Sequence, residues 1–263
     1  MKDESRDTAQ DAVETAFRKA LRLGKRVLPL SVAGWLDPLG SGRPAIGRVR
    51  FGDLARTSPI DGEFGFGRGT PIDRFYIESF LERNRNDIAG RVLEIGNAIY
   101  SRRFGAERVT RQDVLDVRPG NPQATIVGDI SAADVLPRDS FDCIVLTQTL
   151  QYIYDLRAAV AELHAALKPG GVLLVTLPGI SQIEPDFSDG TRYWAFTTAS
   201  ASRLFAEVFD AASVSVESHG NVFAAVSFLH GVALEEVPPS KLLVQDADYP
   251  MIVTLRAVRR LQG

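Results

Sequence analysis

The chain has 263 residues, enough to bury one large domain or one domain with an extension. Hydrophobic residues make up 45% of it and charged residues 24%, as in ordinary soluble globular proteins. A net charge of −3 argues against a broad nucleic-acid surface, which would need clustered lysines and arginines.

The cysteine content and the hydropathy pattern favour a cytoplasmic location. The single cysteine, Cys143, cannot form an internal disulfide, and its apolar surroundings indicate a buried side chain rather than a reactive thiol. The N-terminal sequence is too polar for a signal peptide, and no apolar run reaches the ~18 residues that a membrane span needs. We therefore expect a cytoplasmic protein without an internal disulfide.

The N-terminal part predicts a helical extension and a linker over residues 1–60, followed by one domain over residues 61–263. Within residues 13–30, apolar side chains recur at helical spacing, and basic side chains crowd the later half. This segment either docks on its own domain or makes peripheral contact with a membrane. Residues 37–44 are rich in turn formers, as expected of a linker.

A glycine-punctuated loop precedes the next predicted helix. Thr70 has the properties of an N-cap, and Pro71 suits the first helical turn. The helix that follows leads directly into the first strand, so Arg74 and Tyr76 are candidate ligand contacts. The alternative is a solvated arginine and a half-buried tyrosine.

Residues 90–96, with the sequence G-R-V-L-E-I-G, form the segment around which the remaining elements are arranged. The apolar run ends in Glu94 and Gly96, a pattern typical of a buried parallel strand followed by a ligand-binding turn. In an open α/β sheet, ligands bind at the carboxyl ends of the strands. We therefore expect both residues at a ligand site.

Strands and helices alternate after this segment, which predicts an α/β fold with a doubly wound sheet and helices on both faces. The expected strands, including the first, are residues 90–96, 109–113, 124–129, 141–146, 172–177, 214–217 and 252–258, and the expected helices are residues 97–105, 156–167, 199–209 and 222–232.

Four segments in this order resemble the class I S-adenosylmethionine-dependent methyltransferases, in particular the small-molecule type called methyltransferase type 11. They are V-L-E-I-G, G-D-I, F-D-C-I-V-L-T-Q-T-L and L-K-P-G-G-V-L-L-V-T, which begin at residues 92, 128, 141 and 167. The resemblance implies a Rossmann-like sheet of seven strands, mostly parallel with an antiparallel last strand. The segment G-T-P-I-D-R-F-Y-I-E at residues 69–78 also resembles methyltransferases that accompany glycosyltransferases in bacterial polysaccharide biosynthesis.

The resemblance implies S-adenosylmethionine as the cofactor and assigns the residues that hold its methionine and ribose. Glu94 matches the acid near the methionine end, and Gly96 matches the glycine that permits close backbone approach. Asp113 matches the acid that accepts hydrogen bonds from the ribose hydroxyls, because an ionised carboxylate is an acceptor only. Asp116 takes this role if the strand ends a few residues later.

The resemblance also assigns the residues that contact the adenine of the cofactor and those that line the channel leading to the methyl acceptor. Asp129 matches the acid that accepts from the adenine amino group, with the Ile130 backbone beside the ring. Thr147 and Gln148, which follow the fourth predicted strand, are expected to line the channel between cofactor and acceptor.

Two departures from the family pattern keep a second function open. Ala98 and Tyr100 stand where further glycines are usual, and Gln151 and Tyr152 stand where Glu-His often occurs. The chain is therefore expected to be an active methyltransferase or, alternatively, an inactive cofactor-fold protein that acts as a binding partner in a biosynthetic complex. A dehydrogenase ranks lower because the G-x-G-x-x-G fingerprint is missing.

The implied reaction is in-line displacement of a methyl group from a sulfonium, most simply O-methylation of a small molecule or glycan precursor, without a metal. Positioning and exclusion of water then dominate catalysis, and Tyr152 and His219 are the candidate general bases. Residues 179–196 are expected to form an acceptor lid with Tyr193 and Trp194 as substrate contacts. The acceptor's identity and the oligomeric state stay open.

Overall fold

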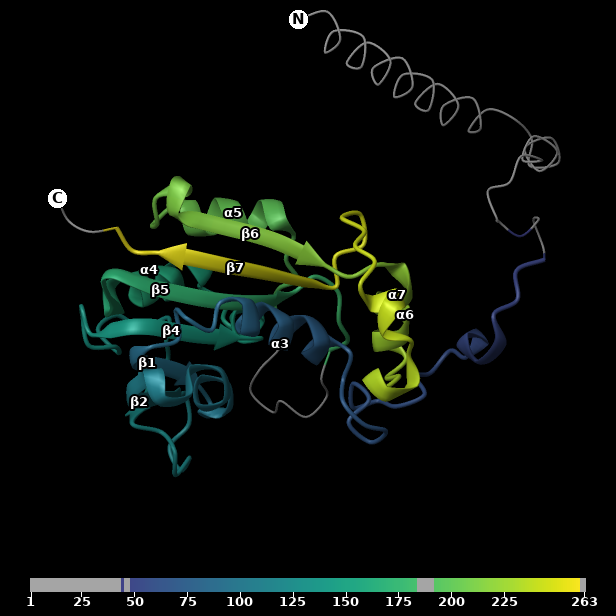
Figure 1. Ribbon diagram of the computed structural model, residues 1–263, viewed down its shortest axis with the longest axis horizontal. Coiled ribbons are helices and arrows are strands. Elements are labelled where there is room, and N and C mark those ends of the chain that lie inside the picture. Colours follow the sequence, from purple (N-terminus) through teal and green to yellow (C-terminus); the bar gives the residue numbers. More distant parts are fainter. Residues whose placement is uncertain (1–43, 45–47, 184–191, 261–263) are drawn as a thin grey trace, which may run out of the picture. The chain divides into compact units, whose positions relative to one another are not determined.

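The computed structural model describes residues 44, 48–183 and 192–260 (Figure 1). The chain divides into two compact units, Met1–Ala55 and Arg56–Gly263. The predicted N-terminal helix and its basic segment lie outside the described residues, so the extension over residues 1–60 and the domain from residue 61 stay predictions. None of the helices in the described ranges is long and apolar enough to cross a bilayer.

A seven-stranded sheet with the order β3-β2-β1-β4-β5-β7-β6 forms the centre of the second unit (Figure 1). The first five strands in sequence pair in parallel, and β7 pairs antiparallel with both β5 and β6. This confirms the predicted mostly parallel sheet with an antiparallel last strand. The strands are β1 (Gly90–Ile95), β2 (Val109–Asp116), β3 (Ile126–Val127), β4 (Phe141–Thr147), β5 (Leu167–Pro178), β6 (Val214–His219) and β7 (Ile252–Val258).

Successive residues of the central strands serve two separate cores, because side chains alternate across a sheet. Val92 and Cys143 pack with α3 (Asp73–Arg83) on one face. Leu93 and Ile144 pack on the other face with α4 (Leu156–Ala166) and α5 (Thr198–Ala206). Figure 1 shows α3 crossing the near face, which gives the predicted arrangement of helices on both faces.

The shorter helical segments complete the connections between strands. They are η2 (Ser101–Gly105), a π-helix, the 3-10 turns η3 (Ala106–Arg108), η4 (Leu150–Tyr152), η5 (Ala211–Ser213) and η6 (Leu234–Glu236), and the helices α6 (Val222–Leu229) and α7 (Pro239–Leu242). The first unit contributes the 3-10 turn η1 (Gly52–Ala55) to the described residues.

Helix α3 begins later than expected, and Thr70 is not its N-cap. The first helical residue is Asp73. Thr70 instead donates through its backbone N and its Oγ1 to the carboxylate of Glu235, at 2.9 and 2.7 Å. The Thr70 side chain is therefore engaged in a tertiary contact and does not cap the helix that the local sequence predicted.

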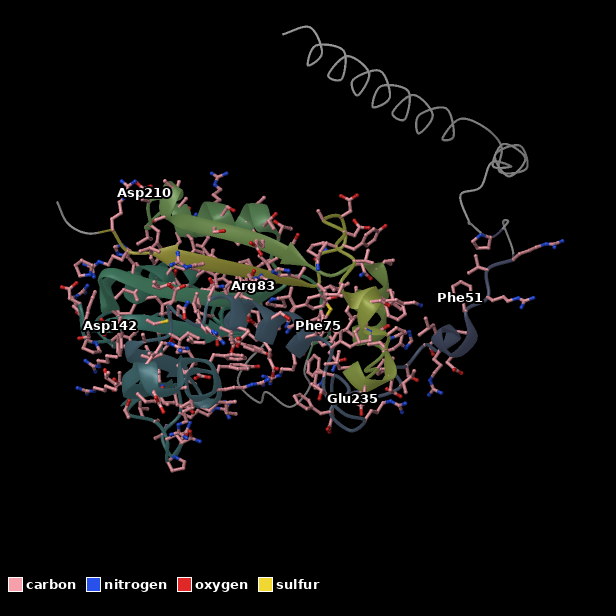
Figure 2. The ribbon with its side chains drawn as sticks, viewed as in Figure 1. Phe51, Phe75, Arg83, Asp142, Asp210 and Glu235 are labelled. Atoms are coloured by element: carbon pink, nitrogen blue, oxygen red, sulfur yellow. The ribbon has the colours of Figure 1, made fainter. Side chains whose placement is uncertain are left out.

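The loop before α3 is fixed to the segment between β6 and β7. Phe64 stacks on Phe228 of α6 with ring centroids 5.6 Å apart, and Arg68 forms an ion pair with Glu236. Figure 2 shows Glu235 of this segment beyond one end of the strands and Asp142, near the start of β4, at the other end. The loop and α6 thus lie at the carboxyl ends of the parallel strands.

Candidate functional site

The carboxyl ends of four neighbouring strands place four sequence-predicted residues in a row. The strand order β3-β2-β1-β4 sets the sequence along this edge: Asp129 follows β3, Asp116 ends β2, Gly96 follows β1 and Thr147 ends β4. An elongated ligand that lies across the strand ends meets these groups one after another, as expected at this edge of an α/β sheet.

Strand β2 corrects the expected position of the ribose acid. The strand continues three residues beyond Asp113, because Val114 and Leu115 are buried and pair with β1. Asp113 therefore lies within the strand, where its carboxylate accepts from Arg91 Nε at 2.7 Å and Thr125 Oγ1 at 3.1 Å. Asp116 is the acid at the strand end.

The carboxylate of Asp116 faces the turn after β1 through one bridging side chain. Asn121 Nδ2 donates to Asp116 Oδ2 at 2.7 Å and to the Gly96 carbonyl at 2.6 Å. Asp116 Oδ1 accepts from the backbone N of Arg118 at 3.0 Å. The acid keeps the capacity to accept further hydrogen bonds, since an ionised carboxylate offers about four lone-pair positions.

Gly96 makes the turn that the strand–acid–glycine pattern predicted. Its φ is +77°, in the region that other residues rarely adopt, and beyond its chain neighbours no atom lies within 4 Å of the position a Cβ would take. A ligand can therefore approach the backbone closely at this point.

Glu94 holds the turn rather than projecting freely from it. Its carboxylate is 2% exposed and accepts from the backbone N of Tyr100 at 3.0 Å and from the N and Oγ of Ser101 at 2.8 and 2.5 Å. Burial raises the pKa of this carboxyl to about 7, against the opposing effect of the Ser101 hydrogen bonds. The acid thus fixes the first helical turn after Gly96 and also lines the cavity described next.

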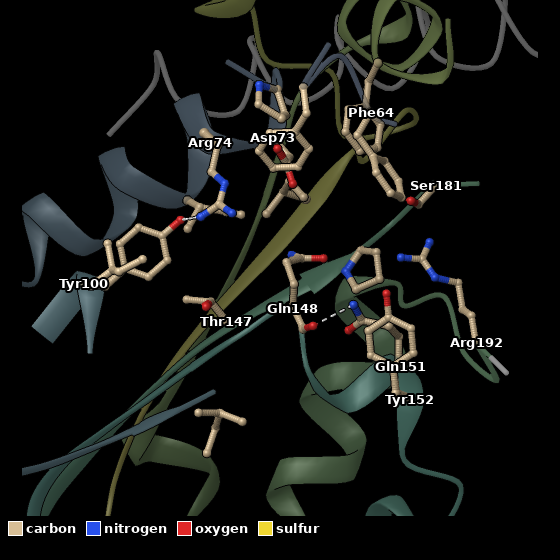
Figure 3. A pocket seen from close by; sticks show the side chains of 18 of the residues that line it. Phe64, Asp73, Arg74, Tyr100, Thr147, Gln148, Gln151, Tyr152, Ser181 and Arg192 are labelled. Atoms are coloured by element: carbon tan, nitrogen blue, oxygen red, sulfur yellow. Dashed lines mark hydrogen bonds between the residues drawn. The ribbon is translucent and has the colours of Figure 1, made fainter. Parts of the chain in front are cut away.

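A cavity of about 420 Å³ opens beside this turn, at the ends of β1, β4 and β5 (Figure 3). Five of the sequence-predicted site residues line it, and polar and aromatic groups from the loops before and after the sheet strands complete it. The lining residues used below are Phe64, Asp73, Arg74, Glu94, Asn97, Tyr100, Thr147, Gln148, Gln151, Tyr152, Ser181 and Arg192.

Arg74 and Tyr100 form one side of the cavity. The Arg74 guanidinium donates to the Tyr100 hydroxyl and lies 5.5 Å from the ring centroid. Figure 3 shows this pair on the opposite side of Gln148 from Arg192. Tyr100, at a position where the resemblance leads one to expect glycine, has φ −75° and ψ −41°, helical values that any residue can adopt.

Gln148 and Gln151 occupy the middle of the cavity after β4. Gln148 has φ +47°, a strained conformation for a side chain other than glycine, and its backbone N donates to the Thr176 carbonyl at 2.9 Å. Gln151 is buried and donates from Nε2 to the Gln148 carbonyl at 2.8 Å. Its Oε1 is buried and has no hydrogen-bond partner among the described residues.

Tyr152, Arg192 and Asp73 contribute the remaining reactive side chains. Arg192 lies 5.9 Å from the Tyr152 ring centroid, and its buried Nε and Nη1 have no partner within the described ranges. Asp73 Oδ1 is likewise buried without a partner there. Burial raises the pKa of the Asp73 carboxyl, although the charge of Arg74 opposes this.

Two predicted residues lie away from the cavity. Tyr76 is buried in a separate core, where its hydroxyl donates to the Leu242 carbonyl at 3.0 Å and burial raises its pKa to about 12. His219 stacks on Tyr76 and has its Nε2 2.9 Å from Thr254 Oγ1, and burial lowers its pKa. The expected roles of Tyr76 as a cofactor contact and of His219 as a base do not fit these positions.

Tyr193 and Trp194 also lie outside the cavity lining. Both rings pack against Tyr154, at centroid distances of 5.3 and 5.9 Å, and remain 46% and 36% exposed. Trp194 Nε1 donates to the Ile153 carbonyl at 2.9 Å. Within the predicted lid, Ser181 and Arg192 reach the cavity instead, and residues 184–191 are not described.

Asp129 and Ile130 lie at the far end of the strand-end row. Asp129 is exposed and accepts from the N and Oγ of Ser131 at 2.8 and 2.7 Å, whereas the Ile130 side chain is buried in the main core. Neither lines the cavity, so the expected adenine contacts remain predictions.

Sequence reasoning missed Asp73 and gave no role to Gln151 and Arg192. Asp73 is the first residue of α3, where an acid is common because it interacts favourably with the helix dipole, so its position alone did not indicate a site. Gln151 was visible only as a departure from the family, and Arg192 only as one of several polar residues after β5. Their common property is burial beside a cavity, which no local pattern of the sequence encodes.

The strand-end row and the cavity fit S-adenosylmethionine. Open space at Gly96 allows close backbone approach, Asp116 offers acceptor capacity beside it, and Arg74 provides a cation at the neighbouring end of the cavity. These are the groups that a ligand with a ribose and a carboxylate requires.

Comparisons with known proteins agree with this fit. Residues 93–175 match the family model described as "Methyltransferase domain". A probable S-adenosylmethionine-dependent methyltransferase of Mycolicibacterium smegmatis is 27% identical over 180 residues, which cover 66% of this chain and 65% of that relative. The match thus spans less than two thirds of the relative's length.

Two solved structures have a similar fold. One is phosphoethanolamine N-methyltransferase 2 of Haemonchus contortus in complex with S-adenosyl-L-methionine, with 18% identity, a TM-score of 0.49 and coverage of 83% of this chain and 62% of that one. The other is 1,6-didemethyltoxoflavin-N1-methyltransferase of Burkholderia thailandensis, with 14% identity, a TM-score of 0.46 and coverage of 72% and 78%.

Proposed function

We propose that this chain is a class I S-adenosylmethionine-dependent methyltransferase that methylates a hydroxyl group of a small-molecule acceptor, a proposal that the match of residues 93–175 to the methyltransferase-domain model supports. The observation that carries the proposal is the row of Asp129, Asp116, Gly96 and Thr147 along one sheet edge, with a cavity that opens at its end. The row suits an elongated cofactor, and the cavity provides room for a second molecule next to it.

When bound, S-adenosylmethionine supplies a methyl group on a sulfonium, a good leaving group that an acceptor oxygen can displace in line. The chain's own residues then position the acceptor and exclude water. Gln148 stands between the two sides of the cavity, and Thr147 and Phe64 also line it (Figure 3). Burial of the site strengthens each polar contact inside it.

The hydroxyl proton needs an acceptor, and two groups of the cavity can take it. We propose that Asp73 Oδ1 accepts it, because this atom is buried without a described partner and the raised pKa makes the ionised carboxylate a stronger base. Tyr152 lines the same cavity and is the second candidate. The proton moves from the acceptor oxygen to the base as the carbon–oxygen bond forms.

The resemblance of residues 69–78 to methyltransferases that accompany glycosyltransferases supports one acceptor class. We therefore propose a sugar or glycan precursor as the acceptor. Phe64 and Tyr152 offer aromatic surfaces in the cavity, and such surfaces pack on sugar rings.

Cofactor binding tests the proposed function first. Calorimetric titration with S-adenosylmethionine and S-adenosylhomocysteine should give saturable binding, and a ligand at about 100 times its dissociation constant should stabilise the fold by roughly 2.7 kcal/mol. Absence of binding by either ligand would overturn the proposal. Binding without turnover on any sugar acceptor would favour the inactive binding partner that Tyr100 and Ala98 left open.

The choice of base is tested by matched substitutions. Asp73→Asn and Tyr152→Phe each remove a proton acceptor with little change in shape, and His219→Gln serves as the control outside the cavity. Substitution of the true base should lower kcat by about 100-fold or more, because general-base catalysis contributes a factor of this size. Loss of kcat in the His219 variant alone, with the fold intact, would contradict this site.

A further inference from the structure

Several buried polar atoms that line the cavity have no partner among the described residues; Asp73 Oδ1, named above as a base, is one, and the others lie on the side of Gln148 away from Arg74 (Figure 3). In the part of the chain that the structure describes, they include Gln151 Oε1 and both Nε and Nη1 of Arg192. Buried polar groups are normally hydrogen-bonded, and a desolvated cation without a counter-charge is costly. These atoms therefore indicate where a bound molecule supplies the missing partners.

The two cations of the cavity stand on opposite sides. Arg74 comes from α3 beside the Gly96 turn and donates to Tyr100, whereas Arg192 comes from the segment after β5 and lies over Tyr152 (Figure 3). No ion pair among the described residues involves either one. Two separated cations in one cavity fit two anionic groups.

The cofactor accounts for only one of these anionic groups. S-adenosylmethionine has a single carboxylate, and Arg74 is the cation next to the turn that holds the cofactor's methionine end under the proposed function. Arg192 faces the cavity from the other side, with Gln148 between (Figure 3). The Arg192 guanidinium therefore has no anionic group of the cofactor to bind and can bind one on the acceptor.

We propose that the acceptor carries an oxyanion, a carboxylate or a phosphate, that the Arg192 guanidinium binds. A planar guanidinium is well suited to both groups. Gln151 Oε1 receives a hydroxyl or amine hydrogen of the same molecule, because an amide oxygen is an acceptor only. The inference rests on the proposed methyl-transfer function and narrows its acceptor to an acidic small molecule such as a sugar acid or a sugar phosphate.

Binding of simple anions tests the subsite directly. Inorganic phosphate and acetate are titrated into protein saturated with S-adenosylhomocysteine, with chloride at matched ionic strength as the reference. At least one anion should bind the wild type, and Arg192→Gln should weaken it by about tenfold or more, the usual effect of losing a hydrogen bond to a charged group. Arg192→Lys keeps the charge and should retain part of the affinity.

A matched arginine provides the control. Arg157 is exposed, pairs with Glu207 and does not line the cavity, so Arg157→Gln should leave anion binding unchanged. Both variants should bind S-adenosylhomocysteine within about twofold of the wild type. Weaker S-adenosylhomocysteine binding in Arg192→Gln, with the fold intact, would assign Arg192 to the cofactor and overturn the inference.

Activity on paired acceptors separates the two anions. Glucuronate and glucose 6-phosphate are each compared with glucose, and the preferred acidic member should exceed glucose in kcat/KM by about tenfold or more, a preference that Arg192→Gln removes. Cofactor binding without any Arg192-dependent preference would overturn the oxyanion subsite alone. Arg192-dependent anion binding without cofactor binding would overturn the methyl-transfer function instead.

Discussion

The two sides of the cavity are built in different ways. On the cofactor side, Glu94, Gly96 and Tyr100 come from seven consecutive residues, and the Glu94 carboxylate accepts hydrogen bonds from the backbone N of Tyr100 and Ser101. On the acceptor side, Gln151 and Arg192 come from distant segments, and several of their buried atoms have no described partner. The buried carboxylate of Glu94 is thus satisfied within the chain, whereas the buried atoms of Gln151 and Arg192 are left for the proposed acceptor.

This difference indicates which substitutions affect folding and which affect binding. A residue whose partners lie within the chain contributes mainly to stability, because its loss leaves a buried group unpaired. A residue whose buried atoms face the cavity contributes mainly to ligand affinity. The acids of the cofactor side test this distinction most sharply.

The largest effect is expected at Asp113. Although burial alone raises it, the hydrogen bond and charge of Arg91 hold the pKa of this carboxyl below its usual value. Asp113→Ala breaks this largely buried ion pair and should lower the free energy of unfolding by about 3 kcal/mol, as measured by urea denaturation. S-adenosylhomocysteine affinity of the folded variant should stay unchanged. Weaker affinity with unchanged stability would return the ribose role to Asp113.

A comparable effect is expected from pH through Glu94. Its folded pKa of about 7 exceeds the ordinary value of 4.5. The folded state thus holds the proton more tightly, and the stability that this provides is complete below about pH 4.5 and lost as pH rises through about 7. At 1.36 kcal/mol per unit, the loss reaches at most about 3 kcal/mol.

Glu94→Gln should remove this pH dependence even if the variant is less stable overall. Unfolding free energies of both proteins are compared across this pH range, and the difference between them should shrink as pH rises. Glu107→Gln, on the exposed turn η3, is the control and should keep the wild-type slope. A wild-type slope in the Glu94 variant would show that other groups cause the pH dependence.

A smaller effect, on binding rather than folding, is expected at Asp116. Asp116→Ala should weaken S-adenosylhomocysteine binding by about 2 kcal/mol, the scale of hydrogen bonds to a charged acceptor, as measured by calorimetry. Asp116→Asn keeps the shape and an acceptor oxygen and should lose less. Unchanged affinity in the alanine variant would remove Asp116 from the cofactor site.

The smallest effect is expected at Tyr193. Its ring packs on Tyr154 outside the cavity, so Tyr193→Phe should change the acceptor KM and the S-adenosylhomocysteine dissociation constant by no more than about twofold, or roughly 0.4 kcal/mol. A large rise in KM alone would restore Tyr193 to the acceptor site, as the sequence predicted.

The sequence by itself determined the alternation of strands and helices and the turn at the centre of the fold. A run of Val92, Leu93 and Ile95 followed by Gly96 is a local signal, because an apolar strand and a turn with positive φ each involve residues that are adjacent in sequence. A contact between near neighbours in the sequence also caps α5, where the Thr197 side chain accepts from the backbone N of Ser200.

Only the tertiary structure decided where β2 ends and which side chains meet in the cavity. Pairing of Leu115 with Ile95 extends β2 and moves the strand-end acid from Asp113 to Asp116. Gln151 and Arg192 are brought together by packing of segments about 40 residues apart, as expected when burial rather than local pattern defines a site. Contacts between residues far apart in sequence leave no periodic signal, so the acceptor side could be recognised only once the fold had placed its polar atoms out of water.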